Sequence, residues 1–187
     1  MSLLTPMMRT SPLTAWFSDA QRVQGMLDFE AALARAQVEC GLVPQAALNP
    51  IIESCRHENI DFAALGQAAA SAGNLAIPLV KQLTARVKQR DDAAARYVHW
   101  GATSQDAIDT GFILQLRGAL EETDSLLQQL LDALAHQAAR YQDTVMPGRT
   151  WMQHALPVTF GLKLAGTLDA LLRWQVDGED VYTPEQF

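Results

Sequence analysis

The sequence predicts an all-α protein, with a small helical N-terminal domain followed by long antiparallel helices of an oligomeric helical bundle. Two observations favour this fold class. Alanine, leucine and glutamine are abundant while β-branched residues are sparse, a balance that favours helices. Apolar residues recur at helical intervals, and no strand-like alternation of apolar and polar residues is evident, so we expect essentially no sheet.

The first helix is predicted from SDAQRVQGMLDFEAALARAQVECG, residues 18–41. Ser18 and Gln21 have the spacing of a capping box at its start, and Gly41 is a typical residue to end it. Glu30 falls on the apolar stripe of this helix. We interpret Glu30 as one half of a partly buried ion pair rather than as a site residue.

Short helices follow, each with a recognisable start signal. Asn49 is expected to cap a helix that begins at Pro50, and Asp61 to cap the next one, which Gly73 ends. These elements and the first helix predict one small helical domain over residues 1–105.

A long helix is predicted from Asp106 to Tyr141, because the chain contains no proline there. Thr103 or Ser104 can cap it, and Asp106 is placed to complete a capping box from Thr103. Its apolar stripe is too wide for one neighbouring helix to cover, so we expect partner helices from other copies of the chain. The stripe consists of Ile113, Leu116, Leu120, Leu127, Leu130, Leu134 and Tyr141, widened by Leu114, Leu126 and Leu131.

A second bundle helix is predicted to open at Pro157 and to return antiparallel as far as Trp174. Residues 106–174 would then form a long-helix bundle domain. The remaining residues, 175–187, are polar and acidic and are expected to form a disordered tail.

The bulk properties exclude several classes of function. A net charge of −7 without any basic run argues against a nucleic-acid partner. The sequence has no signal peptide and no apolar stretch of about 20 residues, so we expect a cytoplasmic protein without a membrane partner. Cys40 and Cys55 match no metal spacing and are expected to be free thiols. No metal or nucleotide-phosphate motif is present, and we predict no cofactor.

Two polar clusters precede predicted helix starts, where unpaired backbone N–H groups and the helix dipole favour anions. Taken singly, each residue has a structural explanation as a cap, a surface cation or a core side chain, so the joint pattern carries the functional hypothesis. About one helix length separates the clusters along the chain, which predicts a site assembled from different chains. The first cluster is His99, Thr103, Ser104 and Gln105; the second is Arg149, Thr150, Gln153 and His154, with Trp151 beside them.

Two segments carry a family resemblance. HWGATSQDAIDT (residues 99–110) followed by GRTWMQHALPVTFG (148–161) resembles the first two signature segments of the fumarase/aspartase superfamily. LDFEAALARAQVECGLVP and AGNLAIPLVKQL are more narrowly similar to its bacterial 3-carboxy-cis,cis-muconate cycloisomerase branch. The resemblance implies a homotetramer whose active sites draw on three subunits and need neither metal nor organic cofactor. It also implies closure of a carboxymuconate to 4-carboxymuconolactone, a step of protocatechuate breakdown in the β-ketoadipate pathway.

The resemblance also implies roles for the cluster residues toward a small polycarboxylate substrate. Thr103, Ser104 and Gln105 would hold one carboxylate, and His99 would line the pocket as a catalytic candidate. Arg149, Thr150 and Gln153 would orient the other carboxylates.

One position of the second segment departs from the family pattern. Trp151 stands where many relatives have a histidine of the active site. The resemblance therefore implies that Trp151 lines the substrate site. His154 becomes the candidate for the proton-handling role.

The third family segment, a serine-bearing loop of the GSSxMPxKxNP kind, has no counterpart in the sequence. We therefore expect this chain to be an N-terminal portion that has no turnover by itself. Two other functions stay open. One is an adenylosuccinate lyase-like enzyme of the same superfamily, and the other is a non-catalytic helical assembly fragment.

Overall fold

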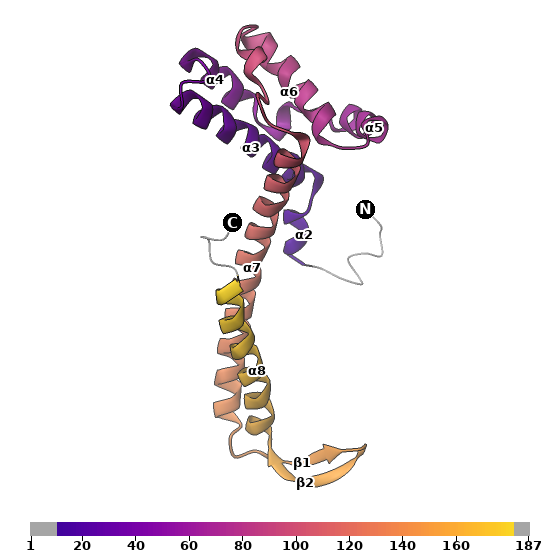
Figure 1. Cartoon of the computed structure of the whole chain (residues 1–187). Helices are drawn as coiled ribbons and strands as arrows, with labels where there is room; N and C mark the ends of the chain where they lie inside the picture. The colour runs from indigo at the N-terminus through magenta and orange to yellow at the C-terminus, as the bar shows by residue number, and fades with distance from the viewer. Residues whose placement is uncertain (1–10, 182–187) are drawn as a thin grey trace. The chain divides into compact units, whose positions relative to one another are not determined.

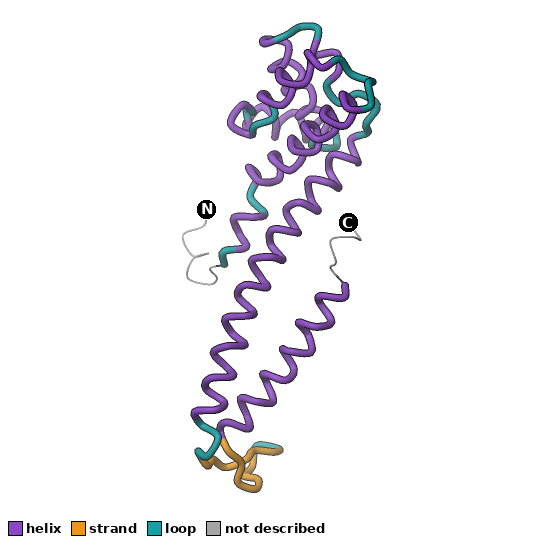
Figure 2. Tube along the Cα trace, turned by 90° about the vertical axis from the view of Figure 1, so that its left-hand side faces the viewer, coloured by secondary structure: helices purple, strands orange, loops and turns teal. Residues whose placement is uncertain are grey.

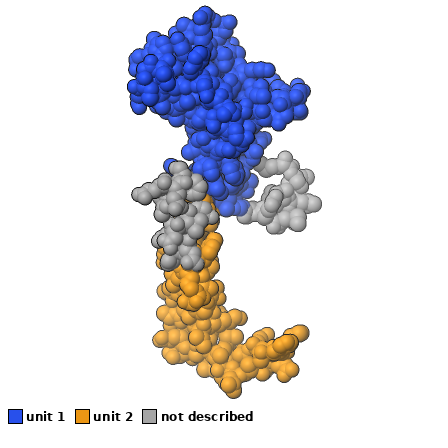
Figure 3. Space-filling model, viewed as in Figure 1, with its two compact units in different colours: residues 1–119 blue, residues 120–187 orange. Residues whose placement is uncertain are grey.

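The computed structural model describes residues 11–181, and the side chains as far as residue 175. The chain divides into two compact units, residues 1–119 and 120–187, which Figure 3 distinguishes by colour. Helices dominate both units, which confirms the all-α class apart from one small sheet. The division between the units lies inside the long helix, and the domain boundary at residue 105 stays a prediction.

Unit 1 is a cluster of helices around one hydrophobic core (Figure 1). α4 packs against both α3 and α6, and the most deeply buried side chains include Leu27, Ile51 and Leu83. Its elements are α2 (Leu13–Trp16), α3 (Asp19–Glu39), α4 (Gln45–Ser54), η1 (His57–Asn59), α5 (Phe62–Ala72), α6 (Ala76–Arg90), η2 (Ala94–Tyr97) and the first part of α7 (Ser104–Arg140).

The predicted caps of α3 and α5 are confirmed. The Ser18 hydroxyl accepts a hydrogen bond from the Gln21 amide at 3.3 Å, and the Asp61 carboxylate accepts one from the Ala64 amide at 3.0 Å. Gly73 ends α5 in the left-handed conformation, with φ of 74°. These local signals correctly locate the helix ends because each depends on residues three or four apart.

The prediction that Asn49 caps a helix beginning at Pro50 is wrong. α4 begins at Gln45, and Pro50 lies inside it. Ala47 and Ile51 are buried one turn apart on either side of Pro50, so burial of this face outweighs the backbone hydrogen bond that the proline lacks.

α3 and α7 approach each other closely at a pair of glycines. A Cβ atom at Gly25 would lie 2.7 Å from the carbonyl oxygen of Gly111, and one at Gly111 would lie 2.9 Å from the amide nitrogen of Met26. Both clashes involve backbone atoms, which cannot rotate away as a side chain does. The two glycines therefore set the separation of α3 from α7 within unit 1.

Unit 2 contains the second part of α7, a β-hairpin and α8 (Phe160–Val181). α8 returns alongside this part of α7, as Figures 1 and 2 both show. Leu127 and Leu131 are buried, and the rings of Tyr141 and Phe160 lie 5.3 Å apart where α8 begins. The predicted antiparallel return is confirmed.

The expectations of no sheet and of a helix opening at Pro157 are wrong. β1 (Val145–Thr150) and β2 (Gln153–Thr159) form an antiparallel hairpin in which Pro147 pairs with Pro157. α8 begins only at Phe160, where the Thr159 hydroxyl accepts a hydrogen bond from the Leu162 amide at 3.1 Å. The extended backbone forms because a proline in each strand disfavours helix on both sides of the turn.

α8 also continues past Trp174, where the second bundle helix was expected to end. Residues 175–181 of the predicted tail are helical, and residues 182–187 lie outside the described residues.

Candidate functional site

The first polar cluster surrounds the start of α7. Thr103 is its N-cap: the Thr103 hydroxyl accepts from the Gln105 amide at 3.2 Å, and the Asp106 carboxylate accepts from the Thr103 amide at 2.9 Å. This is the predicted capping box. The Gln105 side chain donates to Asp109 at 2.6 Å, one turn along the helix. Ser104 is half-buried, and no hydrogen bond of its hydroxyl is found within residues 11–181.

His99, the fourth residue of this cluster, contacts α3. Its Nδ1 lies 2.5 Å from Oε1 of Glu30, whose side chain is 2% exposed, whereas that of His99 is 16% exposed. Burial raises the pKa of the Glu30 carboxyl, and the hydrogen bond from His99 opposes that rise. The structure thus gives Glu30 a polar partner, and the contact is an ion pair when the His99 imidazole is protonated. The partner was not predicted, because 69 residues separate the two side chains in sequence.

A second contact attaches the same loop to α3. The side-chain amide of Gln37, seven residues after Glu30 on the buried side of α3, donates to the carbonyl oxygen of Trp100 at 2.6 Å. The rings of Tyr97 and Trp100 lie 6.1 Å apart. Sequence reasoning missed Gln37, although a glutamine on the apolar stripe of a helix is a signal that it needs a buried partner.

The second polar cluster is the end of the β-hairpin. Arg149 is paired with His154 and Thr150 with Gln153, so the four predicted residues form two cross-strand pairs. Directly opposed residues of antiparallel strands lie on the same face of the sheet. Arg149 and His154 are therefore neighbours across the hairpin.

Trp151 and Met152 form the turn between these pairs. Both have positive φ, 48° and 61°, and their exposed fractions are 91% and 105%. A two-residue hairpin turn with both residues left-handed is type I′, in which asparagine and glycine are preferred. Trp151 thus does not fill a core in this chain. It extends into solvent beside the two polar pairs.

A bulge lies just behind the polar pairs. The register shifts between Pro147 and Arg149, so that Gly148 faces both Ala155 and Leu156. A Cβ atom at Gly148 would lie 2.5 Å from the Leu156 carbonyl oxygen, which explains glycine at this position. The bulge shifts the alternation of the strand by one residue, and this shift places Arg149 opposite His154.

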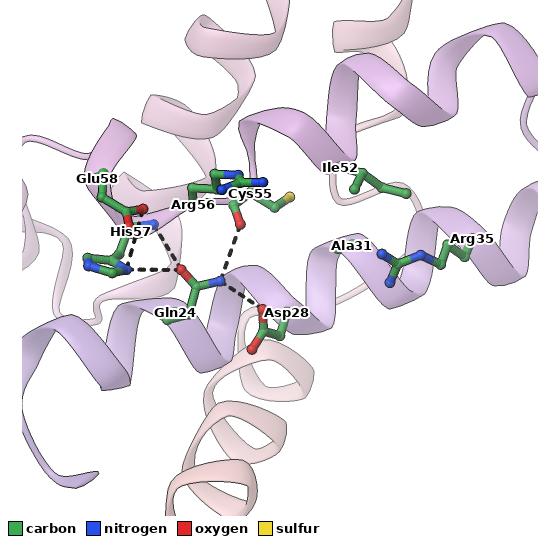
Figure 4. A pocket seen from close by; sticks show the side chains of 9 residues that line it. All are labelled: Gln24, Asp28, Ala31, Arg35, Ile52, Cys55, Arg56, His57 and Glu58. Carbon is green, nitrogen blue, oxygen red and sulfur yellow. Dashed lines mark hydrogen bonds and ion pairs between the residues drawn. The ribbon is translucent and has the colours of Figure 1, made fainter. Parts of the chain in front are cut away.

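A cavity of about 480 Å³ opens elsewhere in unit 1, beside α3, the end of α4 and η1 (Figure 4). At its wall, the Gln24 side chain accepts from the His57 amide at 2.9 Å and donates to the Cys55 carbonyl at 3.2 Å. Burial raises the pKa of the Cys55 thiol to about 12. None of the predicted site residues lines this cavity, which is bounded by Gln24, Asp28, Ala31, Arg35, Ile52, Cys55, Arg56, His57 and Glu58.

Within residues 11–181, no three His, Cys, Asp or Glu side chains gather closely enough to hold a metal ion. None of the helices described there combines the length and apolarity needed to span a bilayer.

The helical fold and the two polar segments together indicate one class of protein, the lyases. The chain belongs to the lyase family, whose model matches residues 7–181. It is 58% identical over 163 residues to the 3-carboxy-cis,cis-muconate cycloisomerase of Pseudomonas aeruginosa, covering 87% of this chain and 36% of that protein. The enzyme of the same name from Bradyrhizobium diazoefficiens is 50% identical over 171 residues, covering 91% of this chain and 38% of that protein.

A solved structure gives the same relationship. The 3-carboxy-cis,cis-muconate lactonizing enzyme of Pseudomonas putida superposes with a TM-score of 0.86 at 55% identity, covering 88% of this chain and 38% of that one. The chain thus spans little more than a third of the length of these relatives.

Proposed function

We propose that the whole protein is a cycloisomerase that closes 3-carboxy-cis,cis-muconate to 4-carboxymuconolactone without a cofactor, in the breakdown of protocatechuate. The observation that carries this proposal is the 58% identity to an enzyme named for this reaction, extending through both polar clusters. A cytoplasmic location is part of the same proposal.

At the start of α7, Ser104 is the candidate for the first carboxylate contact. Its hydroxyl is not used in the capping box, whereas the Thr103 hydroxyl and the Gln105 amide already have partners. Thr103 and Gln105 would contribute by reorienting toward the ligand. The positive end of the α7 dipole favours a carboxylate at this point.

At the hairpin, Arg149 is the candidate for the second carboxylate. A guanidinium group presents two parallel N–H donors that match a carboxylate. Thr150 and Gln153 form the adjacent pair and would orient the remaining carboxylate. In the ring closure, a carboxylate oxygen adds to a carbon–carbon double bond, and the electron pair moves toward the neighbouring carboxylate. A proton is then added at carbon.

His154 and His99 are the two candidates for transferring that proton. His154 lies opposite Arg149, so the same hairpin would hold the charge and deliver the proton. Trp151, at the exposed turn, would cover the substrate and reduce its access to water.

We also propose that each site combines segments from different copies of the chain in a homotetramer. α7 has 37 residues, and a helix of that length extends about 55 Å, so residues at its two ends cannot hold one small molecule. Apolar side chains remain exposed on both long helices, among them Leu126, Leu130 and Leu162. Such faces need partner helices, which further copies of α7 and α8 would supply.

The direct test is an ultraviolet assay of the purified whole protein on 3-carboxy-cis,cis-muconate and on adenylosuccinate, in metal-free buffer. We expect turnover of the carboxymuconate alone. Cleavage of adenylosuccinate would support the other enzyme of the superfamily instead. A correctly assembled protein that converts neither compound would support the non-catalytic helical assembly.

A further inference from the structure

The contact between Glu30 and His99 joins a buried carboxylate to a predicted catalytic histidine. Glu30 lies in the middle of α3, among the buried residues Met26, Leu27, Ala31 and Ala34. No Lys or Arg of residues 11–181 forms an ion pair with it, and its partner is the Nδ1 atom of His99 at 2.5 Å. A carboxylate at this position is desolvated, and an apolar residue of similar volume would avoid that cost.

The need to attach the loop that carries His99 to α3 does not explain why position 30 holds a carboxylate. Gln37 already ties the loop to α3 through the Trp100 carbonyl oxygen, and the Tyr97 and Trp100 rings pack together. His99 itself has φ of 58°, a conformation that non-glycine residues rarely adopt. The loop thus holds its histidine in a strained backbone conformation while a buried acid contacts one nitrogen of the ring.

We infer that Glu30 is a positioning residue that acts through His99, keeping hydrogen on Nδ1 and leaving Nε2 to meet the substrate. An ionised carboxylate only accepts hydrogen bonds, so Nδ1 must be the donor of the pair. In neutral imidazole, a hydrogen on Nδ1 makes Nε2 the atom with the lone pair. Glu30 thereby selects one tautomer and one ring orientation. This inference rests on the proposed function, because it requires His99 to act at the substrate site.

The tautomer can be read without any measurement of activity. Long-range ¹H–¹⁵N NMR of the 187-residue chain distinguishes the two imidazole nitrogens of His99. We expect the Nδ1–H tautomer in the unchanged chain. Glu30→Leu should shift the ring toward the Nε2–H tautomer, because leucine cannot accept a hydrogen bond.

Turnover of the whole protein gives the second readout. We expect Glu30→Leu to lower kcat about 10- to 100-fold, the usual effect of losing a partner that orients a histidine, with KM changed less than about threefold. Glu30→Gln keeps an acceptor oxygen of the same shape and should restore part of kcat. Gln37→Leu is the matched control, since it loosens the same loop without touching His99, and its kcat should stay within about threefold of the unchanged protein.

A matched loss of stability separates this role from a purely structural one. Glu30→Leu leaves Nδ1 of His99 without its partner and should lower the thermal midpoint. Gln37→Leu leaves the Trp100 carbonyl oxygen without its donor and should also lower the midpoint, but only Glu30→Leu should lower kcat. If His99→Ala loses activity while Glu30→Leu keeps full kcat and the Nδ1–H tautomer, the inference is overturned. If His99→Ala keeps full kcat, the proposed role of His99 in the site fails instead, and the NMR measurement still decides whether Glu30 sets the tautomer.

Discussion

Arg149 and His154 lie directly opposite each other on β1 and β2, one pair away from the turn of the hairpin. The Cβ atoms of such cross-strand partners are typically about 5 Å apart. A permanent cation and an imidazole therefore share one face of the hairpin. An anionic group bound by the guanidinium would lie within reach of the histidine.

Arg149→Ala in the whole protein should lower kcat/KM about 100- to 1,000-fold, because a charge-assisted contact to a carboxylate is lost as charge develops. Steady-state kinetics and the native mass should be measured together. Arg173→Ala is the matched control, since Arg173 is an exposed arginine of α8 that pairs with Asp169 at 3.0 Å. An Arg149→Ala protein with unchanged mass and unchanged kinetics would contradict the assignment.

Mixing two inactive variants tests whether a site draws on different chains. Ser104→Ala and Arg149→Ala proteins, unfolded together and refolded, should regain about one quarter of full activity, because each segment comes from an intact copy half of the time. Each variant refolded alone serves as the control. No recovery in the mixture would mean that one chain supplies both segments.

Gly25→Ala should destabilise the chain by about 1–3 kcal/mol, the usual cost of overpacking, because the new methyl group would meet the Gly111 carbonyl oxygen at 2.7 Å. Urea unfolding followed by circular dichroism measures the change. Gly66→Ala is the control: it lies within α5, and a Cβ there meets nothing within 4 Å. That substitution should stabilise the chain by up to about 1 kcal/mol through helix propensity.

Cys55 should stay protonated and unreactive at pH 8, since burial raises the pKa of its thiol to about 12, while exposed Cys40 reacts. Thiol titration should therefore count one group per native chain and two after unfolding. The same burial makes the free energy of unfolding depend on pH. The pKa of the Cys55 thiol in the folded chain lies above its ordinary value of 9.0. The contribution of this thiol to the free energy of unfolding is therefore complete below pH 9 and is lost as the pH rises toward 12. Cys55→Ala should reduce this fall in unfolding free energy. Labelling of two thiols in the native chain would contradict the prediction.

The sequence predicted those features that depend on near neighbours. The caps at Ser18 and Asp61 and the box from Thr103 to Asp106 follow from spacings of three residues, and the structure contains all of them. Long apolar stripes likewise predicted α3 and α7. Helix ends and helix faces can thus be predicted from a single sequence when no other interaction competes.

The hairpin and the histidine contact were missed for different reasons. The turn at Trp151 and Met152 contains no asparagine or glycine, so the usual sign of a type I′ turn is absent. The partner of Glu30 comes from a distant loop, and no local pattern links the two residues. Both features depend on tertiary structure, and the spacing of residues along a single sequence does not reveal it.

The two residues of the hairpin turn bear on what the tip of the hairpin is built for. Two bulky side chains occupy backbone conformations that suit smaller residues, and neither is buried in this chain. A hairpin selected only for its own folding would carry asparagine and glycine there. The identities of Trp151 and Met152 therefore do not follow from the folding of the hairpin. Asparagine and glycine at these two positions would relieve the left-handed strain, at the cost of the apolar surface that the tip now exposes.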